Sequence, residues 1–467
     1  MKLDPTAFPQ AAHEALDDAR LRTALGRLKT HFVHKRAEAI AHYGDFEALR
    51  EAGAAIRDAA LSNLDVLLET FERNVTARGG HVHWARDAAE ARGIVVNILR
   101  EAGAKTVTKG KSMVTEEIEL NPFLERNGIR PIETDLGEYI IQLRHEPPSH
   151  IIAPAFHLNK EDVAETFREA HTELPASRPL NERSALVAEA RVMLRKQFEA
   201  ADAGITGANF LAAEEGAAVI VTNEGNGDLT RLLPRTHIVV TGLEKVVADM
   251  NDVSVLLRLL TRSATGQEIS SYVSVMSGPG DERGGPRNFH VVLLDNGRTS
   301  LLGGETSEVL RCIRCAACLN HCPIYNAIGG HAYGATYPGP IGAALNPGLL
   351  GIAEAHHHPN ASTFCGRCAE VCPVKIPLPS IMRYWRAKEF ESRIVPKATR
   401  FGLSLWAFAA KRPWLYRIGV RVLASVLKVL GWSEGAVHSL PMMRGWFAVR
   451  DFPAPLGKTF QDLWRAR

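Results

Sequence analysis

The stretch Cys312-Ile-Arg-Cys315-Ala-Ala-Cys318-Leu-Asn-His-Cys322-Pro323 defines the character of this 467-residue chain. Its spacing, C-x2-C-x2-C-x3-C-P, is the one with which bacterial ferredoxins bind iron–sulfur clusters. Three thiolates two residues apart can wrap around one cluster, and in two-cluster ferredoxins the fourth cysteine binds the other cluster. A zinc ribbon separates its two C-x-x-C pairs by a longer loop. The spacing therefore favours iron–sulfur clusters over zinc.

A second, incomplete copy of the motif follows, as Ser362-Thr-Phe-Cys365-Gly-Arg-Cys368-Ala-Glu-Val-Cys372-Pro373. If the last cysteine of each copy binds the cluster of the other copy, four thiolates form one complete site: Cys312, Cys315, Cys318 and Cys372. Three thiolates remain for the second site: Cys322, Cys365 and Cys368. Two hypotheses stay open there, a [4Fe–4S] cluster with a non-cysteine fourth ligand or a [3Fe–4S] cluster. Ser362 is either such a ligand or a loop residue that faces solvent.

All seven cysteines lie in these two motifs, which argues for metal or redox chemistry rather than for disulfides. Two neighbouring clusters suit the relay of electrons better than they suit chemistry at one isolated metal. The composition is otherwise ordinary for a globular protein, with 46% hydrophobic and 23% charged residues. The net charge of +3 creates no strong positive field, so nucleic acid is not an expected partner.

Two different patterns precede the cysteine motifs. Residues 1–70 place apolar residues at helical spacing and predict an N-terminal helical region. Residues 71–304 alternate short β-branched runs with helical segments, which predicts an α/β domain with a mainly parallel sheet. The expected strands include HVHWA, IRPIETD, HIIAPAF, GAAVIVTN and THIVVTG. Asp87 is expected to cap the helix that follows HVHWA, and Gly103 to end it.

The remaining chain is expected to be helical. It divides into a two-cluster ferredoxin-type domain over 305–385 and a basic, amphipathic extension over 386–467. Between Arg393 and Trp432 there are eight Lys or Arg residues and no Asp or Glu. Such an extension docks on its own domain or on a partner subunit, or it lies on a membrane surface.

The sequence also bears on location. We find no apolar run long enough to span a membrane, and the first residues lack the apolar region of a secretory signal. We therefore expect a cytoplasmic protein, with the inner face of the cytoplasmic membrane as one place of contact.

Several segments of the chain resemble the lactate utilisation protein B (LutB) family: RCIRCAACLNHCPIYNAIGGHAYGATYPGPIGA, STFCGRCAEVCPVKIPLP, TKGKSMVTEEIELN, GITGANFLAAEEGAAVIVTNEGN and HIVVTGLEKVV. The resemblance implies an α/β LUD domain, similar in fold to the NagB/RpiA/CoA-transferase group, joined to a ferredoxin-like domain with two [4Fe–4S] clusters. It implies electron transport during the oxidation of L-lactate to pyruvate, together with two partner subunits. The implied cluster ligands are the two cysteine sets given above, and the position of Ser362 leaves one ligand open.

Two other functions stay open at this stage. The LUD domain could itself oxidise a small 2-hydroxy acid, with the clusters as electron sink. Alternatively, the clusters could only stabilise a scaffold that assembles partner subunits. We find no G-x-G-x-x-G dinucleotide fingerprint after a strand, so hydride chemistry is expected elsewhere in a complex, and the sequence assigns no catalytic residue.

Weaker signals lie outside the cysteine motifs. The turn Lys109-Gly110-Lys111-Ser112 could bind an anion, although it lacks the Walker spacing, or it could be a solvated turn. Residues 222–226 follow an expected strand, where open α/β sheets bind ligands. Glu215 could be a nucleophile, as in CoA-transferase-like folds, or a residue of a turn or cap.

Two histidine-containing segments lie between the cysteine motifs. His356-His357-His358 is expected to be an exposed loop rather than a metal site. His331 and Tyr333 lie in a glycine-rich stretch that could shield a cluster from water and so tune its potential.

Overall fold

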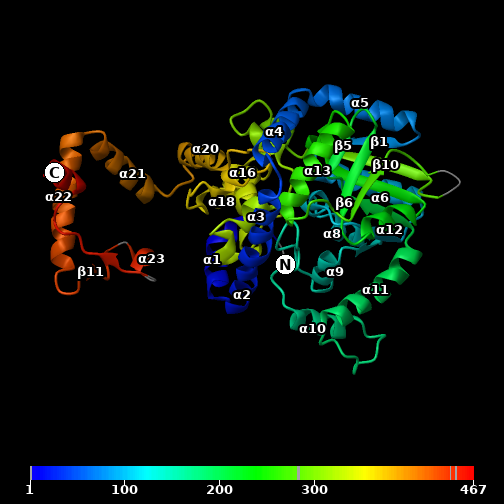
Figure 1. Ribbon diagram of the computed structural model, residues 1–467, viewed down its shortest axis with the longest axis horizontal. Coiled ribbons are helices and arrows are strands. Elements are labelled where there is room, and N and C mark those ends of the chain that lie inside the picture. Colours follow the sequence, from blue (N-terminus) through cyan, green and yellow to red (C-terminus); the bar gives the residue numbers. More distant parts are fainter. Residues whose placement is uncertain (1–2, 281–283, 442, 448–449, 467) are drawn as a thin grey trace. The chain divides into compact units, whose positions relative to one another are not determined.

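The computed structural model describes residues 3–280, 284–441, 443–447 and 450–466. The chain forms two compact units, Met1–Glu389 and Phe390–Arg467 (Figure 1). The first unit contains the N-terminal helices, the two larger sheets and all seven cysteines. The finer division at about residues 70, 304 and 385 stays a prediction.

The described part of the chain opens with helices, as the apolar spacing predicts: α1 (Phe8–Asp17), α2 (Ala19–Leu28), the π-helix η2 (Lys29–Val33), α3 (His34–Ala41), α4 (Phe46–Ser62) and α5 (Leu64–Ala77). Asp45 caps α4 by accepting a hydrogen bond from the Ala48 N–H. Leu28 and Leu49 are buried in one core with the cysteine loops. Arg50 donates to the carbonyl of Cys372 at 2.8 Å. Helices α2 and α4 are therefore packed against the cysteine-containing region.

A parallel sheet forms the centre of the α/β region and confirms the predicted sheet. Its order is β1-β10-β7-β4-β2-β3. The strands are β1 (His81–Ala85), β2 (Thr106–Lys109), β3 (Arg130–Glu133), β4 (Ala203–Thr206), β7 (Thr236–Gly242) and β10 (Asn288–Leu294). Every residue of β7 is buried, as expected of a central parallel strand that is covered on both faces.

Helices cover one face of this sheet: α6 (Ala88–Glu101), α7 (Met113–Glu117) and α8 (Leu120–Arg126). Asp87 caps α6 by accepting from the Glu90 N–H at 2.9 Å, and Gly103 follows the helix with φ of +65°. Both expectations are confirmed. The other face packs against α5 and against a second sheet.

The second sheet has mixed direction, which the sequence patterns did not distinguish. Its order is β8-β5-β6-β9, with antiparallel pairing of β6 to β5 and β9. These strands are β5 (Phe210–Ala212), β6 (Ala217–Thr222), β8 (Val246–Val247) and β9 (Tyr272–Met276). The α/β region also contains α9 (Leu136–Leu143), α10 (Lys160–Ala170), α11 (Arg183–Ala200), α12 (Asn226–Leu232) and α13 (Met250–Ala264).

The predicted strand over 150–156 is wrong, because this segment forms bends and turns. The ring of His150 accepts hydrogen bonds from the N–H groups of Ile152 and Ala153, both at 3.1 Å. Pro154 has no N–H to donate. A side chain therefore takes the backbone donors that a neighbouring strand would otherwise satisfy, and β-branched composition alone cannot reveal this.

Short helices surround the cysteines: α14 (Ala317–Asn320), α15 (Tyr325–Ile328), α16 (Gly339–Leu349), α17 (Ile352–Ala355), α18 (His357–Asn360), α19 (Arg367–Glu370) and α20 (Leu378–Glu391). The second unit contains α21 (Lys397–Ala410), α22 (Pro413–Leu430), α23 (Arg444–Phe447), α24 (Phe460–Arg465) and the antiparallel pair β11 (Ala436–Val437) and β12 (Phe452–Pro453). Among the described residues, no helix is long and apolar enough to cross a membrane.

Candidate functional site

In the described part of the chain, cysteines line two separate cavities of the first unit. The first cavity contains three cysteines of the first motif and one of the second: Cys312, Cys315, Cys318 and Cys372. Ile313, Ile341 and Val374 contribute apolar side chains to its wall, which also includes Arg314. The side chains that can bind metal in this cavity are therefore thiols in apolar surroundings.

The second cavity contains the other three cysteines and the serine of the incomplete motif: Cys322, Cys365, Cys368 and Ser362. Each cavity thus contains residues of both motifs. This is the grouping expected if the last cysteine of each motif binds the cluster of the other motif. Cys365 is exposed, whereas Cys322 and Cys368 are buried. Ser362 lines this cavity and is half-buried, and both interpretations of this residue stay open.

The two cysteine loops share one backbone conformation. Arg314 and Ala316 both have φ of +58°, and the corresponding residues of the second loop, Phe364 and Gly366, have φ of +52° and +83°. Left-handed residues at these positions turn successive N–H groups toward the inside of the loop. The Arg314 N–H donates to Cys312 Sγ at 3.4 Å, and the Phe364 N–H donates to Ser362 Oγ at 3.1 Å. Ser362 therefore occupies the structural position of Cys312.

Further N–H groups point at sulfur, and burial controls the state of the thiols. Tyr325 donates to Cys322 Sγ at 3.5 Å, and Ile376 donates to Cys372 Sγ at 3.4 Å. Burial raises the pKa of Cys315 to about 12 and the pKa of Cys372 to about 11. Without metal these thiols stay protonated at neutral pH, so binding of a metal cluster must release protons.

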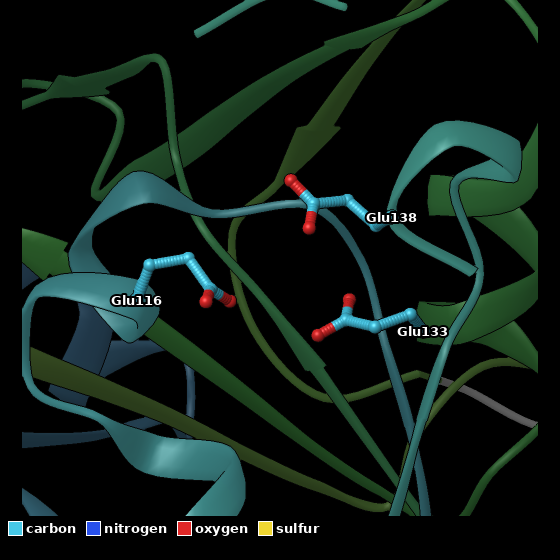
Figure 2. Close-up of side chains that lie close together, drawn as sticks. All are labelled: Glu116, Glu133 and Glu138. Carbon is cyan, nitrogen blue, oxygen red and sulfur yellow. The ribbon is translucent and has the colours of Figure 1, made fainter. Parts of the chain in front are cut away.

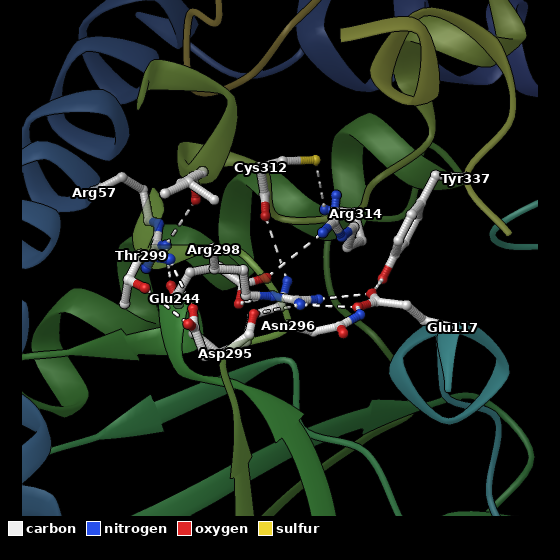
Figure 3. Close-up of polar contacts among 12 residues, drawn as sticks. Arg57, Glu117, Glu244, Asp295, Asn296, Arg298, Thr299, Cys312, Arg314 and Tyr337 are labelled. Carbon is white, nitrogen blue, oxygen red and sulfur yellow. Dashed lines mark hydrogen bonds and ion pairs between the residues drawn. The ribbon is translucent and has the colours of Figure 1, made fainter. Parts of the chain in front are cut away.

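A buried network of charged side chains joins the α/β region to the first cysteine loop (Figure 3). Arg298, 1% exposed, donates to Glu117 and to Glu244, both at 2.7 Å. Glu117 also accepts from the Tyr337 hydroxyl at 2.6 Å, and Glu244 lies 3.5 Å from the Arg314 guanidinium. Burial raises the pKa of Glu244, but the positive charges around it, led by Arg298, outweigh burial and lower that pKa to about 2. Glu244 is therefore ionised in the folded protein.

Lys245 lies next to the same loop. Its ammonium group donates to the carbonyl of Cys312 at 3.4 Å. Burial, followed by the charge of Arg314, lowers the pKa of Lys245 to about 7. Arg57 of α4 donates to the carbonyls of Val246 and Leu310, at 3.0 and 3.1 Å. Hydrogen bonds from Lys245 and Arg57 thus hold the segment around Leu310 and Cys312 against the α/β region.

A larger cavity, of about 240 Å³, lies beside the first cysteine cavity. It is lined by the turn 110–112 after β2, by residues 207–209 after β4 and by residues 222–224 and 226–227 after β6. Ile151, Ile313 and Arg314 line both this cavity and the first cysteine cavity. One layer of side chains therefore separates them. The hypothesis of a ligand-facing loop over 222–226 agrees with this position.

The turn that begins at Lys109 is not solvated, and that interpretation is wrong. Lys109 is fully buried, and its ammonium lies 2.7 Å from Glu133 and 3.0 Å from Glu116. The carboxylates of Glu116, Glu133 and Glu138 face one another around this position (Figure 2), with ligand atoms within 4.8 Å of one another. Burial, followed by the negative charges of Glu116 and Glu133, raises the pKa of Glu138 well above its usual range. Lys109 therefore supplies the cation of this cluster, and Glu138 releases its proton less readily than a solvated carboxyl group does.

The other weaker signals have structural roles. Glu215 accepts a hydrogen bond from the Met250 N–H at 3.3 Å, at the beginning of α13, and it lines none of the cavities described above. The expectation of an exposed histidine loop is wrong: His358 is fully buried and bonds to the Tyr333 carbonyl at 2.7 Å. His331 bonds to the Pro147 carbonyl at 2.8 Å. Glu215 thus acts as a cap, and the histidines tie segments together.

The sequence patterns did not single out the charged residues around the first cysteine loop: Glu117, Glu244, Lys245, Arg298 and Arg314. Arg314 lies inside the cysteine motif, and its position between Cys312 and Cys315 was the one sequence feature that could have indicated a role. The other four come from three distant parts of the sequence, since Glu244 and Lys245 are adjacent, and these parts meet only through the fold.

Comparison with known proteins identifies the class of this chain. A LUD domain matches residues 68–294, and a 4Fe-4S dicluster domain matches residues 308–376. The chain is therefore an iron–sulfur protein in which a LUD domain precedes a 4Fe-4S dicluster domain. A third model, the C-terminal region of lactate utilisation protein B, matches residues 393–467.

Full-length relatives give the family. The chain is 42% identical to lactate utilization protein B of Geobacillus sp. (strain WCH70) and 41% identical to that of Bacillus subtilis (strain 168), over 100% of this chain and 98% of each relative. It belongs to the lactate utilisation protein B family. A crystal structure of a DUF162 family protein from Deinococcus radiodurans is similar over 50% of this chain and 98% of that chain, with 16% identity and a TM-score of 0.29, which is too weak to define a fold.

Proposed function

We propose that the chain is an electron-transfer protein of lactate utilisation that holds two iron–sulfur clusters at once. The observation that carries this proposal is the sorting of the cysteines into two cavities, each with residues of both motifs. The first cluster would be bound by Cys312, Cys315, Cys318 and Cys372. The second would be bound by Cys322, Cys365 and Cys368. Such crossed ligation is the arrangement of two-cluster ferredoxins.

The donor set fits iron–sulfur clusters. Thiols supply sulfur ligands, and backbone N–H groups donate to the sulfurs of Cys312, Cys322 and Cys372 at 3.4 to 3.5 Å. A bound cluster accepts and releases single electrons, and hydrogen bonds to sulfur together with solvent exposure set its potential. Ile313 and Ile341 keep water from the first cavity, whereas Cys365 exposes the second. We therefore assign the exchange of electrons with a partner to the second site.

The second site is completed by Ser362 in our proposal, as fourth ligand of a [4Fe–4S] cluster. Its Oγ accepts a hydrogen bond from the Phe364 N–H. The equivalent N–H of the first loop, that of Arg314, donates to Cys312 Sγ. A hydroxyl oxygen in that position is aimed as the missing sulfur would be. The alternative, a [3Fe–4S] cluster, requires an iron corner to stay empty beside this oxygen.

The proposed roles of lactate and of partner subunits rest on the family of the chain. The relatives are named for lactate utilization, and the cluster pair suits a relay between a lactate-oxidising partner subunit and a further acceptor. A LUD domain of the NagB/RpiA/CoA-transferase type, which the parallel sheet and its covering helices support, would then be the platform that holds the cluster region. Glu117, Glu244 and Arg298 supply the buried charged contacts of that platform.

The second unit is the proposed contact with a partner or with the membrane surface. Its helices α21 and α22 expose large apolar side chains: Phe401, Trp406, Trp414 and Val429, from 63 to 72% exposed. Basic residues without acids accompany them between Arg393 and Trp432. An amphipathic, basic surface of this kind binds anionic lipid or an acidic partner.

The test is a count of iron and acid-labile sulfide per chain after purification without oxygen, combined with EPR spectroscopy. About eight irons, with interacting signals after reduction, support two [4Fe–4S] clusters. About seven irons, with a signal in the oxidised protein, would instead mean a three-iron second site. Zinc in place of iron would refute the electron-transfer role.

Variants separate the two sites. Cys372→Ala should remove the cluster of the first site, although the residue lies in the second motif, and Cys322→Ala should remove that of the second. Signals that follow the motifs in linear order would contradict crossed ligation. Lactate-dependent reduction of the clusters by the isolated chain would favour a catalytic LUD domain, and clusters that no partner can reduce would favour a scaffold.

A further inference from the structure

In the described part of the chain, three histidines meet on one face of the parallel sheet, outside the lining of both cysteine cavities. His81 and His83 belong to the edge strand β1, and His290 belongs to its neighbour β10. The two strands are parallel, and His81 lies opposite His290. Residues two apart on a strand, and residues opposite one another on neighbouring strands, share a face of the sheet. The pairing of these strands therefore brings three imidazole rings together.

The rings lie at distances that suit a shared metal ion. His83 Nε2 lies 3.1 Å from His290 Nδ1, and the ring centroid of His81 lies 5.0 Å from that of His290. Two nitrogens that bind one tetrahedral zinc ion at about 2.0–2.1 Å lie about 3.3–3.4 Å apart. His83 and His290 therefore nearly have the spacing of two zinc ligands. His81 is exposed, so its ring has room to turn and supply a third nitrogen.

Burial keeps two of these imidazoles neutral, which is the form that binds a metal ion. Burial, followed by the charges of His83 and His81, lowers the pKa of His290 to about 4. Burial, followed by the charge of His81, also lowers the pKa of His83. A metal ion therefore meets two unprotonated rings at neutral pH.

The charges around the rings favour a cation. Glu101, the last residue of α6, acts on His83 and opposes the lowering of its pKa. Among the described residues, no lysine or arginine contributes to the pKa shifts of His83 or His290. A divalent ion would therefore be attracted by a carboxylate without repulsion from a cationic side chain that acts on these rings.

We propose that His81, His83 and His290 bind one zinc ion, with the fourth position open to water. Zinc accepts three imidazole ligands in this way, whereas magnesium prefers oxygen. The three histidines lie toward the amino ends of β1 and β10, whereas the turns 110–112 and 207–209 beside the first cysteine cavity follow the carboxyl ends of β2 and β4. All of these strands run in the same direction, so the ion would lie toward the opposite end of the sheet from that cavity.

The position of the site gives the zinc ion a structural role. Zinc has no redox chemistry, and ligands from β1 and β10 would tie the edge strand to its neighbour. This goes beyond the proposed electron relay, in which the chain binds only iron–sulfur clusters. It also stands without that relay, because the ligands are not cysteines.

The test is equilibrium dialysis of the full chain, purified without oxygen, against zinc chloride, with zinc and iron counted on the same sample. One zinc should bind per chain without loss of iron, and excess magnesium should not displace it. X-ray absorption at the zinc edge should show nitrogen or oxygen ligands at about 2.0–2.1 Å and no sulfur at about 2.3 Å. No saturable zinc binding, or zinc on sulfur ligands, would overturn the proposal. Absence of iron together with zinc on nitrogen ligands would refute the relay and leave this inference standing.

Variants assign the ligands. His83→Ala and His290→Ala should each weaken zinc binding at least tenfold, and zinc should raise the thermal midpoint of the wild type but not of either variant. His34→Ala, which removes an imidazole that is 68% exposed, is the matched control and should leave zinc binding unchanged. If either of the first two variants does not fold, His81→Ala still decides, because His81 is exposed. An unchanged zinc affinity in His81→Ala refutes the site.

Discussion

Replacement of Arg298 by methionine tests whether the buried charged network holds the cysteine region on the α/β region. Arg298 is 1% exposed and is the shared cation of Glu117 and Glu244, each at 2.7 Å. Removing one partner of a buried ion pair costs about 3–5 kcal/mol, because the remaining charge stays buried without compensation. Methionine fills a similar volume, so we expect the loss to come mainly from the two abandoned carboxylates.

Hydrogen exchange measures this cost where it arises. If amide exchange in residues 295–317 proceeds through local opening, a loss of about 3–5 kcal/mol should accelerate it between about 10²-fold and a few thousand-fold. Arg86→Met, which removes an exposed contact to Glu90 at 3.0 Å, is the control and should leave exchange in that segment unchanged. Equal protection in both variants would refute the reasoning.

The pH dependence gives a second check on the same variant. Arg298 helps to lower the pKa of Glu244 to about 2, below its unfolded value of about 4.3. The stability from this ionised carboxylate is present above the unfolded pKa and is lost as pH falls toward 2. In Arg298→Met the carboxylates of Glu117 and Glu244 take up protons more easily. The difference in free energy of unfolding between variant and wild type should therefore become smaller from pH 7 to pH 4. A gap that widens on acidification would contradict the assignment.

Three further predictions concern other parts of the first unit. Ser362→Cys should leave the iron count at about eight if Ser362 already binds the fourth iron, with only the EPR line shape changed; a rise from about seven to eight would show that it does not. The pKa of Glu138 is raised in the folded protein, so the wild type loses the stability contributed by its protonated carboxyl group as pH rises above about 4.3. Glu138→Gln should therefore lose less stability over this range than the wild type. Thermal midpoints at pH 5 and 8, with Glu165→Gln as surface control, check this. Gly204→Ala should lower stability by about 1–3 kcal/mol, since its Cβ would lie 1.9 Å from the Thr230 carbonyl oxygen; an unchanged urea midpoint would contradict the packing.

Local sequence determined the parts of this protein that depend on neighbouring residues. The cysteine spacing marked the cluster loops, Asp87 and Gly103 marked the ends of α6, and β-branched runs marked the buried strands. The run over 150–156 failed because the ring of His150 takes its backbone donors. Composition carries no information about that contact.

Only the tertiary structure decided which distant residues meet. The sequence suggested that Lys109 belongs to a solvated turn, yet its side chain is buried. Its charge is compensated there by Glu116 and Glu133, which lie on other elements of the fold. In the same way, Arg314 becomes a wall of the large cavity only when its loop packs on the ends of β2, β4 and β6. Periodicity and spacing describe one segment at a time, whereas compensation of buried charge and the shape of a cavity arise from several segments at once.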